Sequence, residues 1–146
     1  MKDIKIEKAN AKDISALAYI EAQHETAPGW GSSGIKSELE QNNSCILKAH
    51  MGGKIIGFIS GKIIPPELQI INLAVEQNYV RQSVATKLLC ALIAESQKTG
   101  CTKTTLEVNE KNIPAFKLYS NVGFKVVGKR PKFYNNTYTA LLMDKC

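Results

Sequence analysis

The spacing of hydrophobic positions changes period along the first third of the chain. Ile4 and Ile6 alternate with polar residues, which predicts a short first strand. Asn10, three residues before Asp13, marks the start of a helix that extends to about residue 25. A loop around Trp30 and then a short helix over residues 35–41 are expected, because four residues interrupt the helical pattern: Pro28, Gly29, Gly31 and Gly34.

The rest of the chain reads as strands and two longer helices. Strands are predicted over residues 46–51, 54–64, 68–75, 104–108, 124–128 and 138–143. Helices are predicted over residues 83–98 and 112–121, ended by Gly100 and Gly123. The order β-α-α-β-β-β-α-β-α-β-β predicts an α/β (α+β) fold, a mixed sheet flanked by helices. Crossover helices require parallel pairing and hairpins, such as the one at Gly52-Gly53, require antiparallel pairing.

Composition and charge narrow the class of protein. A length of 146 residues with 44% apolar residues fits one globular domain over residues 1–146. We expect no secretion signal and no membrane span, since no apolar run approaches about 18 residues. A net charge of +6 favours an anionic ligand or an acidic partner, and a solvated basic surface fits it equally.

The cysteines and histidines carry no metal or redox pattern. The spacings between the four cysteines match neither a metal-binding nor a redox motif, so we expect reduced thiols in a cytoplasmic protein. These cysteines are Cys45, Cys90, Cys101 and Cys146. His24 and His50 are solitary, and a metal site needs a cluster of ligands. No metal is therefore expected, and both histidines are interpreted as incidental.

The segment from Leu73 to Leu89 carries the first chemical signal. A buried strand passes through a short loop directly into an amphipathic helix. The first backbone N–H groups of that helix, together with its dipole, favour an anion such as a pyrophosphate. Arg81 and Lys87 add positive charge nearby. A plain strand–helix connection without a ligand fits the same pattern.

This turn resembles that of the GCN5-related N-acetyltransferase (GNAT) superfamily, where Gln/Arg-x-x-Gly-x-Gly/Ala opens the helix. The corresponding run here is Val80 to Ala85, with Val80 at the polar position and Ser83 at the glycine position. The resemblance implies a mostly antiparallel sheet of six to seven strands, splayed at its centre to form an acetyl-coenzyme A cleft. It implies that acetyl-coenzyme A is bound in two places. Its acetyl and pantetheine groups contact the backbone of Leu73, Ala74 and Val75. Its pyrophosphate is bound by Arg81, Gln82, Ser83, Val84, Ala85 and Thr86.

The segment from Leu106 to Phe124 carries the second signal. Glu107 lies near the end of a predicted central strand, on the face opposite Leu106 and Val108, and Tyr119 lies on the next helix. Acyl transfer from a thioester to an amine needs two proton events. A carboxylate can take the proton of the ammonium, and a phenol can protonate the thiolate. A surface acid and a core aromatic are the ordinary alternatives for these two residues.

This second run resembles the RimI-type branch of the superfamily, which acetylates the amino-terminal alanine of a small-subunit ribosomal protein. Leu-Glu-Val, an Asn five residues after the Glu, and Leu-Tyr-x-x-x-Gly-Phe keep the spacing of that branch. The resemblance implies that Glu107 is the general base, that Tyr119 is the general acid toward sulfur, and that Asn112 holds the pantetheine arm. The family has an acid immediately before Ala140, where this chain has Thr139.

Two further runs resemble the acceptor side of the same branch. Pro28-Gly29-Trp30 corresponds to a Pro-Trp-Ser-like loop, and the run from Arg130 to Tyr134 corresponds to Arg-Pro-Arg-Tyr-Tyr. The resemblance implies that the peptide side is lined by Trp30, Phe133 and Tyr134. Core packing is an open alternative for each of these aromatic residues.

These features predict an N-acetyltransferase that moves the acetyl group of acetyl-coenzyme A to a protein N-terminal α-amine by direct attack in a ternary complex. A small-subunit ribosomal protein is the candidate partner, with no direct nucleic-acid binding and no membrane. Acetylation of a small-molecule amine or a lysine is the alternative within enzymes. A degenerate acyl-coenzyme A-binding module is the alternative outside them, and three departures from the family pattern motivate it: Val80, Ser83 and Thr139.

Overall fold

A computed structural model describes residues 3–24, 27–80, 83–131 and 138–146. Within these residues, one sheet has the strand order β1-β2-β3-β4-β5-β7-β6. Its strands are β1 (Lys5–Lys8), β2 (Ser44–Met51), β3 (Lys54–Ile64), β4 (Glu67–Val75), β5 (Lys103–Asn109), β6 (Lys125–Pro131) and β7 (Thr139–Lys145). The helices are α1 (Ile14–Glu21), α2 (Gly31–Leu39), α3 (Val84–Gln97) and α4 (Ile113–Val122), with short 3-10 helices η1 (Ala11–Asp13) and η2 (Gln77–Tyr79).

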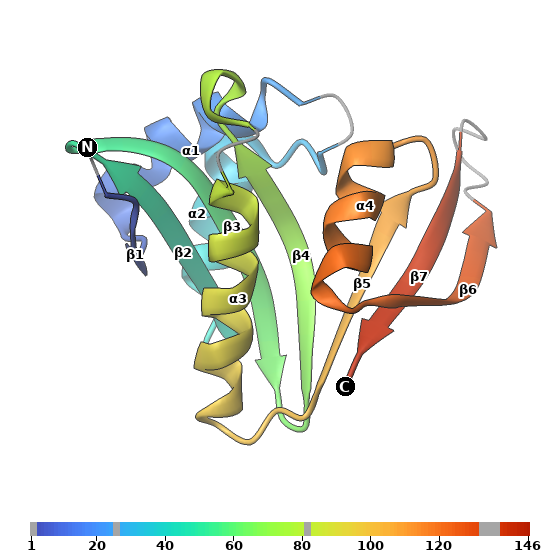
Figure 1. The fold of residues 1–146 in the computed structure, drawn as a ribbon. Coiled ribbons are helices and arrows are strands. Elements are labelled where there is room, and N and C mark those ends of the chain that lie inside the picture. The colour runs from blue at the N-terminus through green and yellow to red at the C-terminus, as the bar shows by residue number, and fades with distance from the viewer. Residues whose placement is uncertain (1–2, 25–26, 81–82, 132–137) are drawn as a thin grey trace.

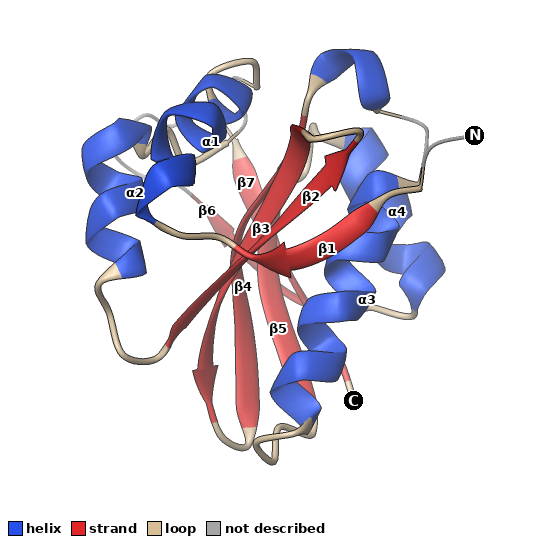
Figure 2. Cartoon of the chain, turned by 90° about the vertical axis from the view of Figure 1, so that its left-hand side faces the viewer, coloured by secondary structure: helices blue, strands red, loops and turns tan. Residues whose placement is uncertain are grey.

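The sheet is a layer between two pairs of helices. α1 and α2 lie on one side of it and α3 and α4 on the other (Figures 1 and 2). Each side has its own hydrophobic core. The core beneath α3 and α4 contains Leu88, Leu89 and Leu92, and the core beneath α1 and α2 contains Leu17, Ile20, Ile35 and Phe58. The predicted element order and the mixed sheet flanked by helices are confirmed.

One pair of neighbouring strands is parallel and short. β4 and β5 pair from Glu67–Lys103 to Gln69–Thr105, while the other neighbours in the sheet are antiparallel. Beyond Gln69 the two strands separate toward their carboxyl ends, as Figure 1 shows between β4 and β5. The splay that the family resemblance implied is therefore present at the centre of the sheet.

β4 carries one extra residue, Ile71, because its register with β3 shifts between Ser60 and Gly61. A bulge of this kind exchanges the faces that later side chains of the strand occupy. Before the bulge, the even-numbered side chains Leu68 and Ile70 pack beneath α3 and α4. After it, the odd-numbered side chains Leu73 and Val75 do so. Asn72 and Ala74 consequently point toward α1 and α2.

The connection between α1 and α2 differs from the sequence prediction. α1 ends at Glu21 rather than near residue 25, and α2 begins at Gly31 rather than at residue 35. The cause is the Glu21 carboxylate, which accepts the backbone N–H groups of Trp30 and Gly31, each at 3.0 Å, and so supplies the cap that starts α2 early. Gly34 fits inside this helix because a Cβ there would lie 2.7 Å from the Cβ of Trp30.

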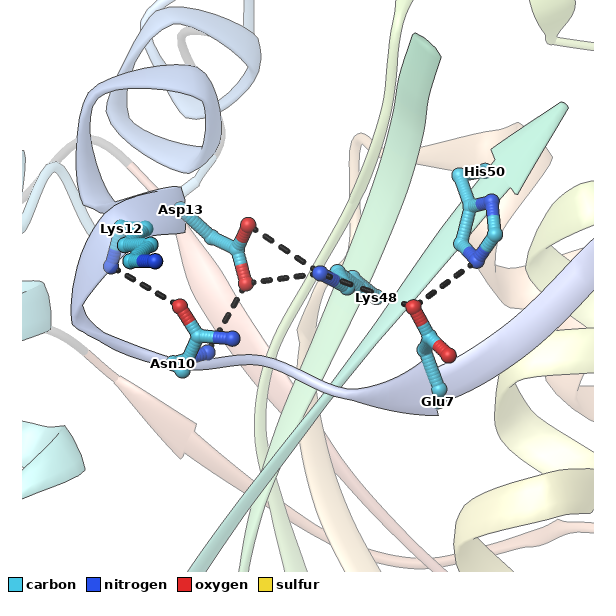
Figure 3. Close-up of polar contacts among 6 residues, drawn as sticks. All are labelled: Glu7, Asn10, Lys12, Asp13, Lys48 and His50. Carbon is cyan, nitrogen blue, oxygen red and sulfur yellow. Dashed lines mark hydrogen bonds and ion pairs between the residues drawn. The ribbon is translucent and has the colours of Figure 1, made fainter. Parts of the chain in front are cut away.

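A polar cluster fixes the beginning of α1 to the edge of the sheet (Figure 3). The Asn10 side chain accepts the Lys12 N–H at 2.9 Å, and the Asn10 N–H donates to Asp13 at 2.8 Å. The Lys48 ammonium of β2 lies 3.0 and 3.1 Å from the two Asp13 oxygens. This pair is mostly buried, with 13% of the Lys48 side chain and 10% of the Asp13 side chain exposed.

We expect Asp13→Ala to lower the free energy of unfolding by about 1–2 kcal/mol, because it removes a cap and leaves the mostly buried Lys48 ammonium with the more distant Glu7 carboxylate, at 3.7 Å, as its partner. Urea unfolding followed by circular dichroism measures this change. Lys12→Ala, at an exposed neighbour, is the matched control and should change stability by less than about 0.5 kcal/mol. Equal stability of the two variants would show that Asp13 and its polar cluster contribute nothing to the free energy of unfolding.

Candidate active site

The site lies where β4 and β5 no longer pair. The segment Leu73–Val75 forms the β4 side of this opening, and Glu107 lies on the β5 side. The side chains of Ala74 and Val75 are buried in the two cores, at 4% and 7% exposure. Whatever this stretch offers a ligand therefore comes from its backbone.

His24 contacts this end of β4. Its Nε2 lies 2.6 Å from the Val75 carbonyl oxygen. A carbonyl oxygen only accepts, so Nε2 carries the proton of this hydrogen bond. Sequence analysis interpreted His24 as incidental, and the structure instead places it against the β4 backbone at the opening. The sequence held no signal for this contact, which joins residues 51 positions apart.

Two other residues of the same segment also bond to β4 or its exit. The Glu21 carboxylate, 2% exposed, accepts the Asn72 side-chain amide at 2.7 Å. The Gln23 side-chain carbonyl accepts the Gln77 N–H at 2.9 Å. With His24, these bonds fix the α1–α2 connection, including Trp30, to the strand that borders the opening.

The amino-terminal end of α3 follows β4 directly. Ser83 has φ = 63°, the left-handed region, and within the described chain it is the non-glycine residue that adopts a positive φ. It precedes the helix without capping it through its side chain. Val84 is 1% exposed and packs in the core, so it can reach a ligand only through its N–H, while Ala85 and Thr86 are half-buried. The predicted contacts Arg81 and Gln82 lie outside the described residues.

Glu107 is exposed on the face of the sheet opposite α3 and α4, because its neighbours Leu106 and Val108 pack into their core. Arg130 of β6 donates from Nε to Glu107 Oε1 at 2.8 Å, and its Nη2 contacts the same oxygen. This hydrogen bond and the negative charge of Glu107 raise the pKa of Arg130.

Tyr119 lies on the other face, in the core that α3 and α4 cover. Its side chain packs edge-on against Phe124, with ring centroids 5.7 Å apart. Burial raises the pKa of Tyr119 to about 12. The phenol is therefore a proton donor throughout the neutral range.

The remaining predicted residues lie at the start of α4, against the core beneath α1 and α2, or outside the described chain. Asn112 caps α4, its side-chain oxygen accepting the Ala115 N–H at 3.2 Å. Trp30 is half-buried and packs against the core beneath α1 and α2. Phe133 and Tyr134 lie outside the described residues. In the described parts of the chain, no three His, Cys, Asp or Glu side chains gather as metal ligands would, and no helix is long and apolar enough to cross a membrane.

A model of the acetyltransferase (GNAT) family matches residues 12–124 of this sequence. The chain belongs to the GNAT family. This match includes the β4–α3 turn, Glu107 and Tyr119, and it makes the protein an acetyl-coenzyme A-dependent N-acetyltransferase. The family resemblance drawn from the two sequence runs is thereby confirmed.

Relatives within GNAT are similar over most of their length. The [ribosomal protein bS18]-alanine N-acetyltransferase of Haemophilus ducreyi is 33% identical over 129 residues, 88% of each chain. The enzyme of the same name from Escherichia coli K12 is 28% identical over 132 residues, 90% of this chain and 88% of the relative. These identities extend the RimI-type resemblance to nearly the whole GNAT domain.

Solved GNAT structures share the fold. The crystal structure of the ribosomal-protein-S18-alanine N-acetyltransferase from Escherichia coli superposes with a TM-score of 0.85 at 26% identity, covering 97% of this chain and 92% of that one. PaiA N-acetyltransferase from Thermoplasma acidophilum, in complex with coenzyme A, gives a TM-score of 0.82 at 22% identity over 98% of each chain. The second likeness concerns the fold alone.

The left-handed conformation of Ser83 generates a stability prediction. Ser83→Ala and Ser83→Val both remove the hydroxyl, but only valine places a β-branched side chain at positive φ. Ser83→Val should be about 1 kcal/mol less stable than Ser83→Ala in urea unfolding. Ser83→Gly should raise the free energy of unfolding by about 0.5 kcal/mol over the native chain, because the relief of backbone strain outweighs the cost of the added entropy of the unfolded chain. Equal stability of Ala and Val variants would contradict a left-handed residue 83.

Tyr119 should make stability fall at alkaline pH. Its pKa is about 12 in the folded chain and about 10 when unfolded. This stabilisation is nearly complete below pH 10 and is lost as the pH rises from 10 to 12, and the loss reaches about 1.4 kcal/mol at pH 11. Urea unfolding between pH 9 and 11 should show a shallower decline for Tyr119→Phe. Tyr19→Phe, at a tyrosine that is 69% exposed, is the matched control and should decline as the native chain does.

Proposed function

We propose that this enzyme acetylates the α-amine at a protein amino terminus, with Glu107 as the base and Tyr119 as the acid. One observation carries the proposal. The two side chains lie on opposite faces of the sheet, Glu107 on β5 beside the opening and Tyr119 on α4, the helix that follows β5. An amine that enters from the Glu107 face and a thioester that enters from the Tyr119 face would meet between the strands.

The residues at the start of α3 fit an anionic donor. The first turn of α3 contains no acidic residue, and the helix dipole adds partial positive charge there. The N–H groups of Val84, Ala85 and Thr86 are the helix-start donors proposed for the pyrophosphate of acetyl-coenzyme A. Gly57 lets α3 approach the sheet this closely, since a Cβ there would lie 3.3 Å from Val84 and 3.2 Å from Leu88.

The backbone of Leu73–Val75 is the proposed partner of the acetyl and pantetheine groups. A β4 N–H that points into the opening can stabilise the negative charge that develops on the carbonyl oxygen. Asn112 is placed beside the β5–α4 turn, where its side chain fixes the start of α4. We propose that Asn112 also contacts the pantetheine arm.

The residues then divide the proton transfers between them. Glu107 accepts a proton from the ammonium, directly or through water, which leaves a neutral amine. The amine nitrogen forms a bond to the acetyl carbon, the bond from that carbon to sulfur breaks, and the nitrogen releases its second proton to water to give the neutral amide. Tyr119 donates a hydrogen bond and then its proton to the departing sulfur. No side chain of the enzyme becomes acetylated in this scheme.

The acceptor is proposed from the relatives and from the loops around Glu107. Two relatives carry the name [ribosomal protein bS18]-alanine N-acetyltransferase, at 28% and 33% identity. An α-amine also has a pKa near 8, well below that of lysine near 10.4, so a single carboxylate suffices as base. We propose an amino-terminal alanine such as that of bS18, with Trp30, Phe133 and Tyr134 on the peptide side and a cytoplasmic location.

A paired assay tests this proposal. Calorimetry should show micromolar binding of acetyl-coenzyme A, and a peptide with a free amino-terminal alanine should be acetylated. The peptide should also contain a lysine, and the same peptide with its amino terminus blocked should not react. Glu107→Gln should lower kcat about 10²-fold or more with the acetyl-coenzyme A affinity unchanged, because Glu107 acts on the amine.

Glu110→Gln, which removes an exposed acid three residues further along, is the matched control and should keep native kcat. Reaction of the blocked peptide would shift the assignment to a lysine acetyltransferase. Binding of acetyl-coenzyme A without turnover of any amine would favour an interaction module.

A further inference from the structure

The contact between Glu107 and Arg130 crosses a strand. Glu107 pairs with Leu142 of β7, and Arg130 pairs with Ala140 of the same strand, so β7 lies between the two charged residues. Leu142 is paired on its other side with Gly128, which has no side chain. The strand partner of Arg130, Ala140, adds only a methyl group, and the guanidinium reaches Glu107 Oε1 at 2.8 Å.

This pair is poorly placed to stabilise the fold. The Arg130 side chain is 57% exposed and the Glu107 side chain 36% exposed. An ion pair in such contact with water contributes about 0–1 kcal/mol to folding. A substitution of Arg130 should therefore leave the structure intact, and its consequences should appear in the chemistry of Glu107.

We propose that Arg130 is a positioning residue for the reaction, which holds Glu107 and offsets its charge so that the bound acceptor ammonium gives up its proton at a lower pH. The inference rests on the function proposed above, in which Glu107 serves as the base for that amine. It assigns a role to a residue of β6 that does not itself touch the reacting atoms.

The physical reason lies in what a lone carboxylate does to a neighbouring ammonium. An isolated negative charge stabilises the protonated amine and raises its pKa, and the protonated amine cannot attack. A guanidinium on the same carboxylate offsets that field. For charges about 5 Å apart in a largely aqueous setting, the effect on the amine is about half to one pH unit.

In the described part of the chain, the other charged groups on this face pair with each other or lie at the strand ends. Lys103 and Asp144 pair with each other at 3.5 Å. Glu67 of β4 accepts the Thr105 hydroxyl at 3.0 Å, at the end where β4 and β5 are joined. Glu110 and Lys111 follow β5 and are exposed. These five side chains thus pair elsewhere or lie at the strand ends, whereas Arg130 contacts the Glu107 carboxylate directly.

The test is the dependence of kcat on pH, from 6 to 9, for Arg130→Gln, Arg130→Lys and the native enzyme with an alanine-terminated peptide. In Arg130→Gln, the fall of kcat on the acid side should begin about half to one pH unit higher than in the native enzyme. This lowers kcat roughly three- to tenfold at pH 6.5 and changes it less at the alkaline plateau. Arg130→Lys should restore the limb, because it keeps the charge. Lys129→Gln is the matched control, since it removes the neighbouring exposed cation of β6, whose strand partner is Leu141 rather than Ala140.

A second acceptor sharpens the result. An aminooxyacetyl peptide has a weakly basic terminal nitrogen that is neutral throughout this pH range, so Arg130→Gln and native enzyme should show the same acid limb with it. An unchanged limb with the alanine peptide, an equal shift in Lys129→Gln, or unfolding of Arg130→Gln would each overturn the role of Arg130. Absence of turnover by the native enzyme with every amine would overturn the proposed function itself, and the role of Arg130 with it.

Discussion

Three residue pairs join β4 to β5, and the active site that we propose depends on where that pairing stops. A longer parallel ladder would place the two strands side by side and close the sheet between Val75 and Glu107. Because the ladder ends at Gln69 and Thr105, backbone on one strand and a carboxylate on the other border a common opening. The bulge at Ile71 lies just past this point and turns Asn72 toward α1, where Glu21 binds it.

The α1–α2 connection depends on the same stretch of β4. Glu21, Gln23 and His24 each contact a residue of β4 or of the turn that follows it. Glu21 does so while also capping α2, so a single buried carboxylate sets both the start of that helix and its distance from the strand. Trp30, which we propose for the acceptor side, is thus positioned relative to β4 by hydrogen bonds as well as by hydrophobic packing.

Much of the fold could be predicted from local signals. Gly52 and Gly53 both adopt positive φ, 58° and 82°, as the hairpin they indicated requires. Gly123 ends α4 in the left-handed conformation, and Asn10 starts the first helical segment. These features are encoded within a few residues, so the pattern along the chain was sufficient to find them.

The features that the sequence did not reveal depend on contacts between distant positions. The start of α2 follows from Glu21, about ten residues earlier, and the contact of His24 with β4 joins residues 51 apart. The sequence indicated Arg130 only as part of a run that resembles an acceptor-side loop. Its contact with Glu107 joins residues 23 positions apart and passes over a whole strand. Ser83 was visible as a departure from the family glycine, but its left-handed backbone became evident only in the structure.

The bulge in β4 also bears on how such a chain can change over generations. Substitution of individual side chains in this strand leaves the alternation of faces intact, whereas insertion or deletion of one residue after position 67 reverses it. Leu73 and Val75 would then exchange places with Asn72 and Ala74, so that a buried amide would enter one core and the Glu21 carboxylate would lose its partner. The fold consequently constrains the residue count of this strand more strictly than the identity of the side chains on it.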